Sequence, residues 1–392
     1  MLKISWIDRS IEAEFARVRN EYPVVTVTGP RQSGKTSLAR RYCQGYAYAN
    51  LELPEIRNLA QSDPKAFFNA YPAPVIIDEV QRLPELLSYI QVLADSTDKR
   101  GQYILTGSHQ LDLVAAISQS LAGRTALLRL LPLSLRELQQ AGVTLSRDEI
   151  LFRGFMPRLY HEDIRPGTLY SEYFQNYIER DLRQLASVRD LLLFEKFLRF
   201  LAGRIGQVIN ISSLAGDVGV CRATLNEWLA VLEASFIIFR LPPWFENIGK
   251  RVVKTPKLYF TEPGLAAWLL DIETPQQISR DPLMGCLFEN MVIAEALKAR
   301  LNAGRMPNLY FYRDARGNEV DLILRQHRQL KPVEIKAAMT FSPDMIVGLN
   351  HFQKQFTNAL PGAVIYAGDI ETTTETTHLL NFIHTANLVS DA

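Results

Sequence analysis

Short, continuous runs of apolar and β-branched residues recur along the first third of the chain. They lie at residues 24–28, 46–51, 75–79 and 102–106, with a weaker one at 126–131. Runs of this kind are typical of strands buried in a parallel sheet. The segments between them include apolar residues at helical spacing, at 6–19, 64–71 and 83–94. Alternating strands and helices over the first ~135 residues predict a parallel α/β sheet.

The pattern changes after Leu131-Pro132-Leu133-Ser134. Residues 135–205 read as mainly helical, with a charged amphipathic helix at 170–185. Three helices at 193–203, 211–218 and 221–234, followed by a hairpin with strands at 236–241 and 257–260, predict a winged helix-turn-helix. A helix at 285–301 and strands at 309–312, 319–324 and 332–336 predict a smaller mixed α/β domain at the end. The expected domain boundaries are 1–135, 136–190, 191–275 and 276–392.

A glycine-rich loop joins the first strand to the next helix. The residues are Gly29, Pro30, Arg31, Gln32, Ser33, Gly34, Lys35 and Thr36, in the pattern G-x-x-x-x-G-K-T, and Ser37 follows them in the helix. Bare backbone N–H groups at a helix N-terminus bind phosphates, a lysine adds a point charge for the β- and γ-phosphates, and a threonine hydroxyl can bind Mg²⁺. The pattern also arises by chance, but the strand before it and the helix after it favour a binding site for ATP and Mg²⁺.

Two carboxylates, Asp78 and Glu79, end the strand at 75–79. Ligand groups gather at the carboxyl ends of parallel strands, where the glycine-rich loop also lies. We expect Asp78 to hold Mg²⁺ and Glu79 to act as the base that polarises an attacking water. The alternative is a strand that ends in a solvated acidic turn.

Three further residues are candidates for contact with the terminal phosphate. Thr106 or Ser108, at the end of the strand at 102–106, would face the γ-phosphate, although small polar residues also end ordinary strands. Arg124 follows a helical stretch and could stabilise the transition state, in cis or from a neighbouring subunit. It could equally be a surface arginine at a helix C-terminus.

Composition limits the classes of partner. The chain has 43 Lys and Arg against 42 Asp and Glu, a net charge of +1, so nucleic acid would have to bind a local basic patch. No apolar run approaches the ~18–20 residues of a membrane span, and the first residues lack the apolar core of a signal peptide. The three cysteines are widely separated, which favours a reducing cytoplasm and argues against a zinc site.

The predicted hairpin is the best candidate for such a patch. Its strands and connection contain Trp244, Phe245, Lys250, Arg251, Lys254 and Lys257. Cations and aromatic side chains together suit phosphate contact and base stacking. Arg222, Thr224 and Asn226 lie where a recognition helix would meet DNA. Winged helices also serve as ATPase lids and as protein docking modules, so a protein partner remains an alternative.

The last strands contain a second acidic constellation. Alternation places Glu334 and Lys336 on one face of a strand, and a hairpin could bring Asp321 beside Glu334. Asp321 and Glu334 would form a Mg²⁺ or Mn²⁺ site, Lys336 would orient water or stabilise charge on a phosphate, and Glu289 of the preceding helix would complete the site. Alternatively, Glu334 and Lys336 form the solvated face of an ordinary strand.

Taken together, these motifs resemble a bacterial and archaeal family of AAA-type ATPases with a nuclease-like C-terminal region. The resemblance rests on the glycine-rich loop, Ile77-Asp78-Glu79-Val80-Gln81, Leu105-Thr106-Gly107-Ser108, Leu121-Ala122-Gly123-Arg124, Tyr177-Ile178-Glu179-Arg180-Asp181, Gly317-Asn318-Glu319-Val320-Asp321 and Val333-Glu334-Ile335-Lys336. It implies a restriction-endonuclease-like fold at the C-terminus, in which Asp321, Glu334 and Lys336 match the catalytic core and Glu289 the helix acid.

Two functions follow from this interpretation. One is a Mg²⁺-dependent ATPase that moves a winged helix and a nuclease-like domain on DNA, with homo-oligomers if Arg124 acts in trans. The other is an ATP-dependent switch whose C-terminal region docks a protein partner without cleaving nucleic acid.

Overall fold

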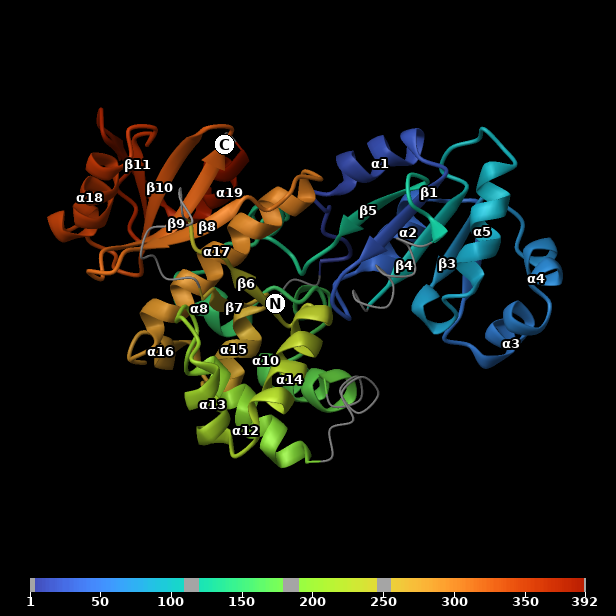
Figure 1. Ribbon diagram of the computed structural model, residues 1–392, viewed down its shortest axis with the longest axis horizontal. Coiled ribbons are helices and arrows are strands. Elements are labelled where there is room, and N and C mark those ends of the chain that lie inside the picture. Colours follow the sequence, from blue (N-terminus) through green and yellow to red (C-terminus); the bar gives the residue numbers. More distant parts are fainter. Residues whose placement is uncertain (1–3, 109–119, 179–189, 245–254, 391–392) are drawn as a thin grey trace.

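Figure 1 shows three parts of the chain in sequence order: an α/β part, a helical part and a C-terminal part built on a second sheet. The computed structural model describes residues 4–108, 120–178, 190–244 and 255–390. None of the helices within these ranges is both long and apolar enough to cross a membrane.

The N-terminal part contains the predicted parallel sheet. Its five strands lie in the spatial order β2 (Ala47–Asn50), β3 (Val75–Asp78), β4 (Tyr103–Gly107), β1 (Val24–Thr28) and β5 (Thr125–Arg129). Every pair of neighbours is parallel. The carboxyl ends of β1, β3 and β4 therefore reach the same edge of the sheet, where ligands bind in such folds.

Helices cover both faces of this sheet. They are α1 (Glu12–Glu21), α2 (Lys35–Tyr42), α3 (Pro54–Ser62), α4 (Pro64–Ala70) and α5 (Leu86–Asp95). Apolar side chains of α1 and α2 form one core with alternate residues of the strands, and those of α3, α4 and α5 form a second. Burial on both faces explains why the strands read as continuous apolar runs. The helix expected from Leu83 begins at Leu86, because Val80–Arg82 forms a 3₁₀ turn.

The helical part begins with four short helices, α7 (Leu135–Gln140), α8 (Arg147–Arg153), α9 (Arg158–His161) and α10 (Pro166–Tyr173). The helix expected at 170–185 is interrupted, because α10 passes into a π-helical turn, Phe174–Ile178, and residues 179–189 lie outside the described ranges.

The three helices and the hairpin expected next are present. They are α12 (Leu191–Ala202), α13 (Ile211–Val218), α14 (Arg222–Ala234) and the antiparallel strands β6 (Ile238–Leu241) and β7 (Lys257–Phe260). Their identity as a winged helix stays a prediction. Two short helices follow, α15 (Pro263–Leu269) and α16 (Pro275–Ile278).

The C-terminal part is a mixed six-stranded sheet beside a long buried helix, α17 (Met284–Asn302). The strands lie in the order β12 (Thr372–Thr373), β13 (Thr377–Asn381), β11 (Gly362–Tyr366), β10 (Gln329–Lys336), β9 (Glu319–Gln326) and β8 (Leu309–Arg313). The remaining helices are α18 (Val347–Gln355) and α19 (Thr385–Ser390), with 3₁₀ turns at Pro343–Ile346 and Phe382–His384.

A buried ion pair in α17 joins this helix to the end of the α/β part. Lys298 Nζ lies 2.7 Å from Glu295 Oε1 and donates to the Leu133 carbonyl at 2.7 Å. Glu295 in turn accepts from the Leu135 backbone N–H at 2.8 Å. The segment that leaves the first sheet is therefore held by the helix that begins the C-terminal part.

Candidate functional site

The glycine-rich loop between β1 and α2 has the backbone that a phosphate-binding loop needs. Gly29 has φ +152°, and a Cβ added there would overlap the Leu130 carbonyl oxygen. Gly34 has φ +95° and begins α2 in the left-handed region, which favours glycine. Lys35 Nζ donates to the carbonyls of Gly29 and Pro30, at 3.0 and 2.7 Å. The loop thus curls over its own lysine at the N-terminus of a helix.

Lys35 is 6% exposed, and this burial lowers the pKa of its ammonium to about 8. The carboxylates of Glu79 and Asp78 act in the opposite direction, and Arg31 adds to the lowering. Removing an ammonium from water favours its neutral form. A phosphate beside Lys35 would replace weak carbonyl contacts with a full negative charge.

Asp78 ends β3 at the centre of a hydrogen-bond cluster. Thr36 Oγ1 lies 3.0 Å from each of its carboxylate oxygens, and Tyr48 donates its hydroxyl at 2.8 Å. Thr106 donates from the neighbouring strand β4. Asp78 is 4% exposed, so it does not belong to a solvated turn. The structure brings together the two residues expected to hold Mg²⁺, Thr36 and Asp78.

Thr106 contacts Asp78, and its expected contact with the γ-phosphate stays a prediction. Its side chain is fully buried and its hydroxyl donates to Asp78, so its contact is with this carboxylate. Ser108, the other candidate, instead donates to Glu79 Oε2 at 3.4 Å. The hydroxyls of Thr106, near the end of β4, and Ser108, just after it, therefore each contact one of the two acids at the end of β3.

Glu79 adopts a left-handed backbone conformation, with φ 57° and ψ 45°. Such a conformation is uncommon in a residue other than glycine, and strained residues cluster at functional sites. The carboxylate accepts from Gln81 Nε2 as well as from Ser108, and it lines the cavity beside the loop. This position suits a base that faces a water near the terminal phosphate.

Arg124 is not brought to this site within the chain. It immediately precedes β5, and its neighbour Thr125 pairs with Val24 at the start of β1, so it lies at the sheet edge opposite the loop. Its guanidinium pairs with Asp95, with N···O distances of 2.6 and 2.8 Å. The expectation that Arg124 acts in cis is wrong for this reason. A role in trans stays a prediction.

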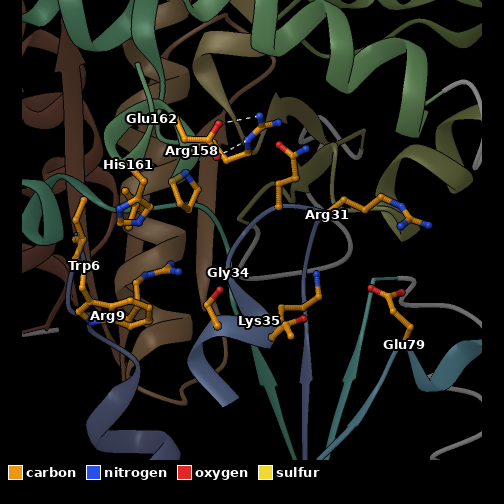
Figure 2. Close-up of a pocket in the computed structure, with 15 residues that line it drawn as sticks. Trp6, Arg9, Arg31, Gly34, Lys35, Glu79, Arg158, His161 and Glu162 are labelled. Atoms are coloured by element: carbon orange, nitrogen blue, oxygen red, sulfur yellow. Dashed lines mark hydrogen bonds and ion pairs between the residues drawn. The ribbon is translucent and has the colours of Figure 1, made fainter. Parts of the chain in front are cut away.

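A cavity of about 390 Å³ opens beside the loop (Figure 2). Ser37 and the loop residues Arg31, Gln32, Gly34, Lys35 and Thr36 line it together with Glu79. Figure 2 shows Lys35 and Glu79 on one side and Trp6 and Arg9 on the other, with Arg158, His161 and Glu162 of the helical part above. Both the segment before α1 and helix α9 thus contribute walls that the sequence motifs did not reveal.

Arg9 supports the loop from below. Its guanidinium donates to the carbonyls of Ser33 and Leu131, both at 2.7 Å, and pairs with Glu137 at 3.2 Å. Glu137 belongs to a capping box with Ser134 at the start of α7. The S-x-x-E spacing was a readable signal for this helix start, whereas nothing in the sequence pointed from it to Arg9.

The residues present fit a nucleoside triphosphate with a divalent ion. Ser33 Oγ is buried and has no hydrogen-bond partner among the described residues. Among the described residues, the hydrogen-bond partners of Lys35 Nζ are two backbone carbonyls. The oxygen atoms of Thr36 and Asp78 lie 3.0 Å apart. Mg²⁺ prefers such oxygen ligands and is usually shared with substrate phosphates.

The second acidic constellation is also partly assembled. Lys336 Nζ lies 2.6 Å from Glu334 Oε2 and 3.3 Å from Asp321 Oδ2, and Asp321 accepts from the Ile335 N–H at 2.8 Å. Burial and the Asp321 carboxylate raise the pKa of Glu334. Burial alone would raise the pKa of Asp321, but Lys336 and Lys257 bring it below its ordinary value. Glu334 is buried, so the alternative of a solvated strand face is wrong.

Glu289 faces a different partner. It accepts from Lys257 Nζ at 3.0 Å and from the Tyr259 hydroxyl at 2.6 Å, and Lys257 also pairs with Glu319 at 2.5 Å. Burial, followed by the Asp321 carboxylate, raises the pKa of Glu289 to about 7. Within the described ranges, no three His, Cys, Asp or Glu residues are arranged to hold a metal ion. The expected three-acid site is therefore not assembled in this conformation.

Helix α18 covers Glu334. A Cβ added at Gly348, in the first turn of α18, would overlap Glu334 Oε1 and the Glu319 carbonyl oxygen. The side chains of Glu334 and Asp321 are 7% and 12% exposed. Helix α18 therefore restricts access to the Glu334 carboxylate.

The predicted basic hairpin is only partly described. Phe245, Lys250, Arg251 and Lys254 lie outside the described residues. Lys257 is 3% exposed and engaged with Glu289 and Glu319, so its expected phosphate contact is wrong. Trp244 packs against Tyr310, with ring centroids 5.2 Å apart. Arg222 and Asn226 are exposed on α14, and Thr224 is half-buried.

A comparison with known protein families agrees with the geometry of the N-terminal part. A family model described as an AAA domain matches residues 21–139. Two domains of unknown function match residues 145–276 (DUF8612) and 284–384 (DUF4143). A Walker-type ATPase of Pyrococcus abyssi is a structural neighbour at 16% identity and a TM-score of 0.46, covering 67% of this chain and 96% of that one.

The relatives found among curated proteins are uncharacterized proteins. The protein Rv2008c of Mycobacterium tuberculosis is 31% identical over 338 residues, which span 85% of this chain and 74% of that protein. A Haemophilus influenzae protein is 22% identical over 353 residues, 80% of this chain and 82% of the relative. The chain belongs to the same family as Rv2008c, and it carries an AAA-type ATPase domain followed by two domains of unknown function.

Proposed function

We propose that the chain binds ATP with Mg²⁺ and hydrolyses the γ-phosphate. The observation that carries this proposal is the meeting of Lys35, the Thr36–Asp78 contact and Glu79 at one edge of the first sheet. Positioning and electrostatic stabilisation account for most of the catalysis of phosphoryl transfer.

Each residue has a role in this proposal. Lys35 and the loop N–H groups bind the β- and γ-phosphates, and Thr36 and Asp78 hold the divalent ion. Bound Mg²⁺ neutralises charge on the phosphate oxygens. Glu79 orients and deprotonates the attacking water, while Ser108 and Gln81 hold its carboxylate in place.

The walls of the cavity suggest where the nucleoside lies. The phosphates occupy the end near Lys35, which leaves the end lined by Trp6, Ile7, Pro157 and His161 for the base and ribose. These residues come from the segment before α1 and from the helical part around α9. ATP would therefore contact both parts at once, and the nucleotide state would be communicated to the helical part.

Replacement of Glu79 by Gln tests the proposal. The expected result is ATP binding close to that of the parent, measured with a fluorescent ATP analogue, and turnover lowered by about 10²-fold or more, the contribution typical of a general base. Glu85→Gln, close in the chain, is a control for loss of one acid. Unchanged turnover in Glu79→Gln would refute the role of this residue, and absence of ATP binding by the parent would refute the proposal.

A second candidate function places the C-terminal part on DNA. The contact of Lys336 with both Asp321 and Glu334 favours it, because this is the pattern expected of a metal-dependent nuclease centre. In this proposal residues 191–275 are a winged helix, residues 276–392 a nuclease-like domain, and residues 136–190 the region between them and the ATPase core at 1–135. Lys336→Ala should abolish Mn²⁺-dependent cleavage, and a parent protein that cleaves no DNA would end this proposal.

The alternative is a nucleotide-dependent switch that docks a protein partner. The position of α18 over Glu334 favours the switch, because a domain that docks a protein needs no open acidic site. ATP turnover measured with and without duplex, single-stranded and branched DNA separates the two, with cleavage read from the same samples. Faster ATP turnover with DNA supports the function on DNA. Turnover that does not change with any of the three DNA forms supports the switch.

A further inference from the structure

A second cavity, of about 370 Å³, is lined by residues from all three parts of the chain. Residues at the end of β5 form one wall, β6 forms another, and the end of α17 with the start of β8 closes the rest. It is distinct from the nucleotide cavity, with which it shares no lining residue. Sites at domain junctions of roughly 300–1,000 Å³ are typical of small-molecule binding.

Arg129, the last residue of β5, is the unusual group in this cavity. Its side chain is half-buried, and within the described ranges it forms no hydrogen bond and no ion pair. Burial lowers the pKa of Arg129, and no neighbouring carboxylate opposes this effect. By contrast, the second arginine of the cavity, Arg240, pairs with Glu233 at 3.0 Å. A partly desolvated guanidinium without a counter-ion is unfavourable unless an anion joins it.

The other walls are mainly apolar. They include Leu131, Phe236, Ile238, Leu301, Leu309 and Tyr310. Met306 lies at the rim and is 75% exposed. The cavity thus offers one uncompensated positive charge against apolar and aromatic surface, which suits a ligand with a charged end and an apolar body.

We propose that this cavity binds a small organic anion, with a carboxylate, sulfonate or phosphate group on Arg129 and an apolar or aromatic body between β6 and the end of α17. Arg129 recognises the charge through its planar fork of N–H donors, and the apolar walls select the body. Arg240 remains with Glu233 and adds no net charge.

The segment that forms this wall also supports the phosphate-binding loop. Leu130 N donates to the Thr28 carbonyl at 2.7 Å, and its own carbonyl packs against Gly29. The Leu131 carbonyl accepts from Arg9, which also holds the Ser33 carbonyl. Ligand binding at Arg129 therefore alters nucleotide affinity. This coupling rests on the proposed nucleotide site, whereas the anion site itself does not.

Two dyes with the same body test the anion site in the full-length protein without nucleotide. Anilinonaphthalene sulfonate carries the anion, and N-phenyl-naphthylamine lacks it. Arg129→Met should weaken binding of the sulfonate dye about ten- to a hundredfold, the range for a hydrogen bond to a charged group, and leave the neutral dye unchanged. Arg129→Lys should retain most of the affinity. Arg17→Met removes an arginine that pairs with Glu14 and Glu21 within α1, and it serves as the matched control.

A second variant separates the ligand site from general loss of structure. Met306→Trp adds bulk at an exposed residue that lines the cavity, so it should reduce binding of both dyes while the melting temperature stays unchanged. Sulfonate-dye affinity that is the same in the parent, Arg129→Met and Met306→Trp would overturn the proposal.

The coupling has its own readout. Saturating sulfonate dye should change the Kd of a fluorescent ATP analogue at least about threefold in the parent and not in Arg129→Met, since coupling between sites is reciprocal. An unchanged Kd in the parent overturns the coupling. Failure of the ATP analogue to bind without dye would refute the nucleotide site instead.

Discussion

The guanidinium of Arg9 and the carboxylate of Glu137 form a buried ion pair of 3.2 Å, with side chains 5% and 0% exposed. Glu137 also accepts from the backbone N–H groups of Ser10 and Ser134, at 2.7 and 2.8 Å. Because Arg9 donates to the Ser33 carbonyl as well, the phosphate-binding loop rests on a pair that joins the segment before α1 to the start of α7. Loop geometry and the junction with the helical part therefore depend on the same two charges.

Replacing Glu137 by Gln should destabilise the protein by about 3–5 kcal/mol, because Arg9 would be left buried without a counter-charge. ATP binding should also weaken as the loop loses its support. Chemical denaturation and titration with an ATP analogue measure the two effects. Glu149→Gln is the matched control, since Glu149 forms the same capping box with Ser146 at an exposed site. We expect the control to cost about 1 kcal/mol or less, and equal losses in both variants would contradict the role of the ion pair.

The depressed pKa of Lys35 predicts proton uptake on ATP binding. With a pKa of about 8 in the free protein, Lys35 is charged below that pH whether or not ATP is bound, so its titration adds no pH dependence there. Above pH 8 the free amine is neutral, while bound phosphates restore its charge. ATP affinity should therefore fall about tenfold per pH unit above 8, until the pKa of the complex is reached.

Calorimetry in two buffers of different ionisation enthalpy measures this uptake directly. About one proton should be taken up per ATP near pH 9 if Lys35 alone titrates. If ATP affinity does not change with pH and no protons are taken up between about pH 7.5 and 9.5, Lys35 stays charged in the free protein, despite its burial.

The strands and the acids at their ends were predictable because both depend on local rules. Parallel strands buried on two faces read as apolar runs, and Asp78 must emerge at the carboxyl edge of its strand. The hairpin of β9 and β10 likewise places Asp321 beside Glu334, because strand alternation fixes which side chains share a face. The same topological rule places Arg124, which precedes β5, at the opposite edge, and applying it to this residue would have excluded a role in cis.

Contacts between distant segments were not predictable. Arg9 is separated by 128 residues from Glu137, and no pattern in either segment identifies the other. Likewise, Lys257 looked like part of a basic surface because the hairpin around it is rich in cations. Only the packing of β7 against α17 and β9 shows that Glu289 and Glu319 neutralise it.

Thr106→Val tests whether the hydrogen bond from Thr106 to Asp78 contributes to Mg²⁺ binding at the proposed site. The substitution keeps the shape of the side chain and removes the hydroxyl that donates to Asp78. Loss of a hydrogen bond to a carboxylate costs about 1.5–3 kcal/mol, so the Mg²⁺ concentration needed for half-maximal ATP turnover should rise about tenfold or more. Thr26→Val on β1 removes a hydroxyl that contacts the Thr125 hydroxyl and should leave the Mg²⁺ requirement unchanged. A response of the same size in both variants would assign the effect to the sheet rather than to Asp78.

Gly348→Ala probes the cover over the second acidic constellation. Its Cβ would collide with the Glu334 carboxylate and the Glu319 carbonyl, so α18 or β10 must shift. Overpacking of this kind costs about 1–3 kcal/mol, more than the ~1 kcal/mol that alanine gains over glycine in a helix. Gly216→Ala in α13, where a Cβ meets nothing within 4 Å, should instead stabilise the protein. Opposite signs of the two changes in free energy of unfolding would show that α18 is seated on Glu334. Stabilisation by both would mean that α18 stands clear of Glu334 in solution, and the acidic pair would then be open to a metal ion and a phosphodiester.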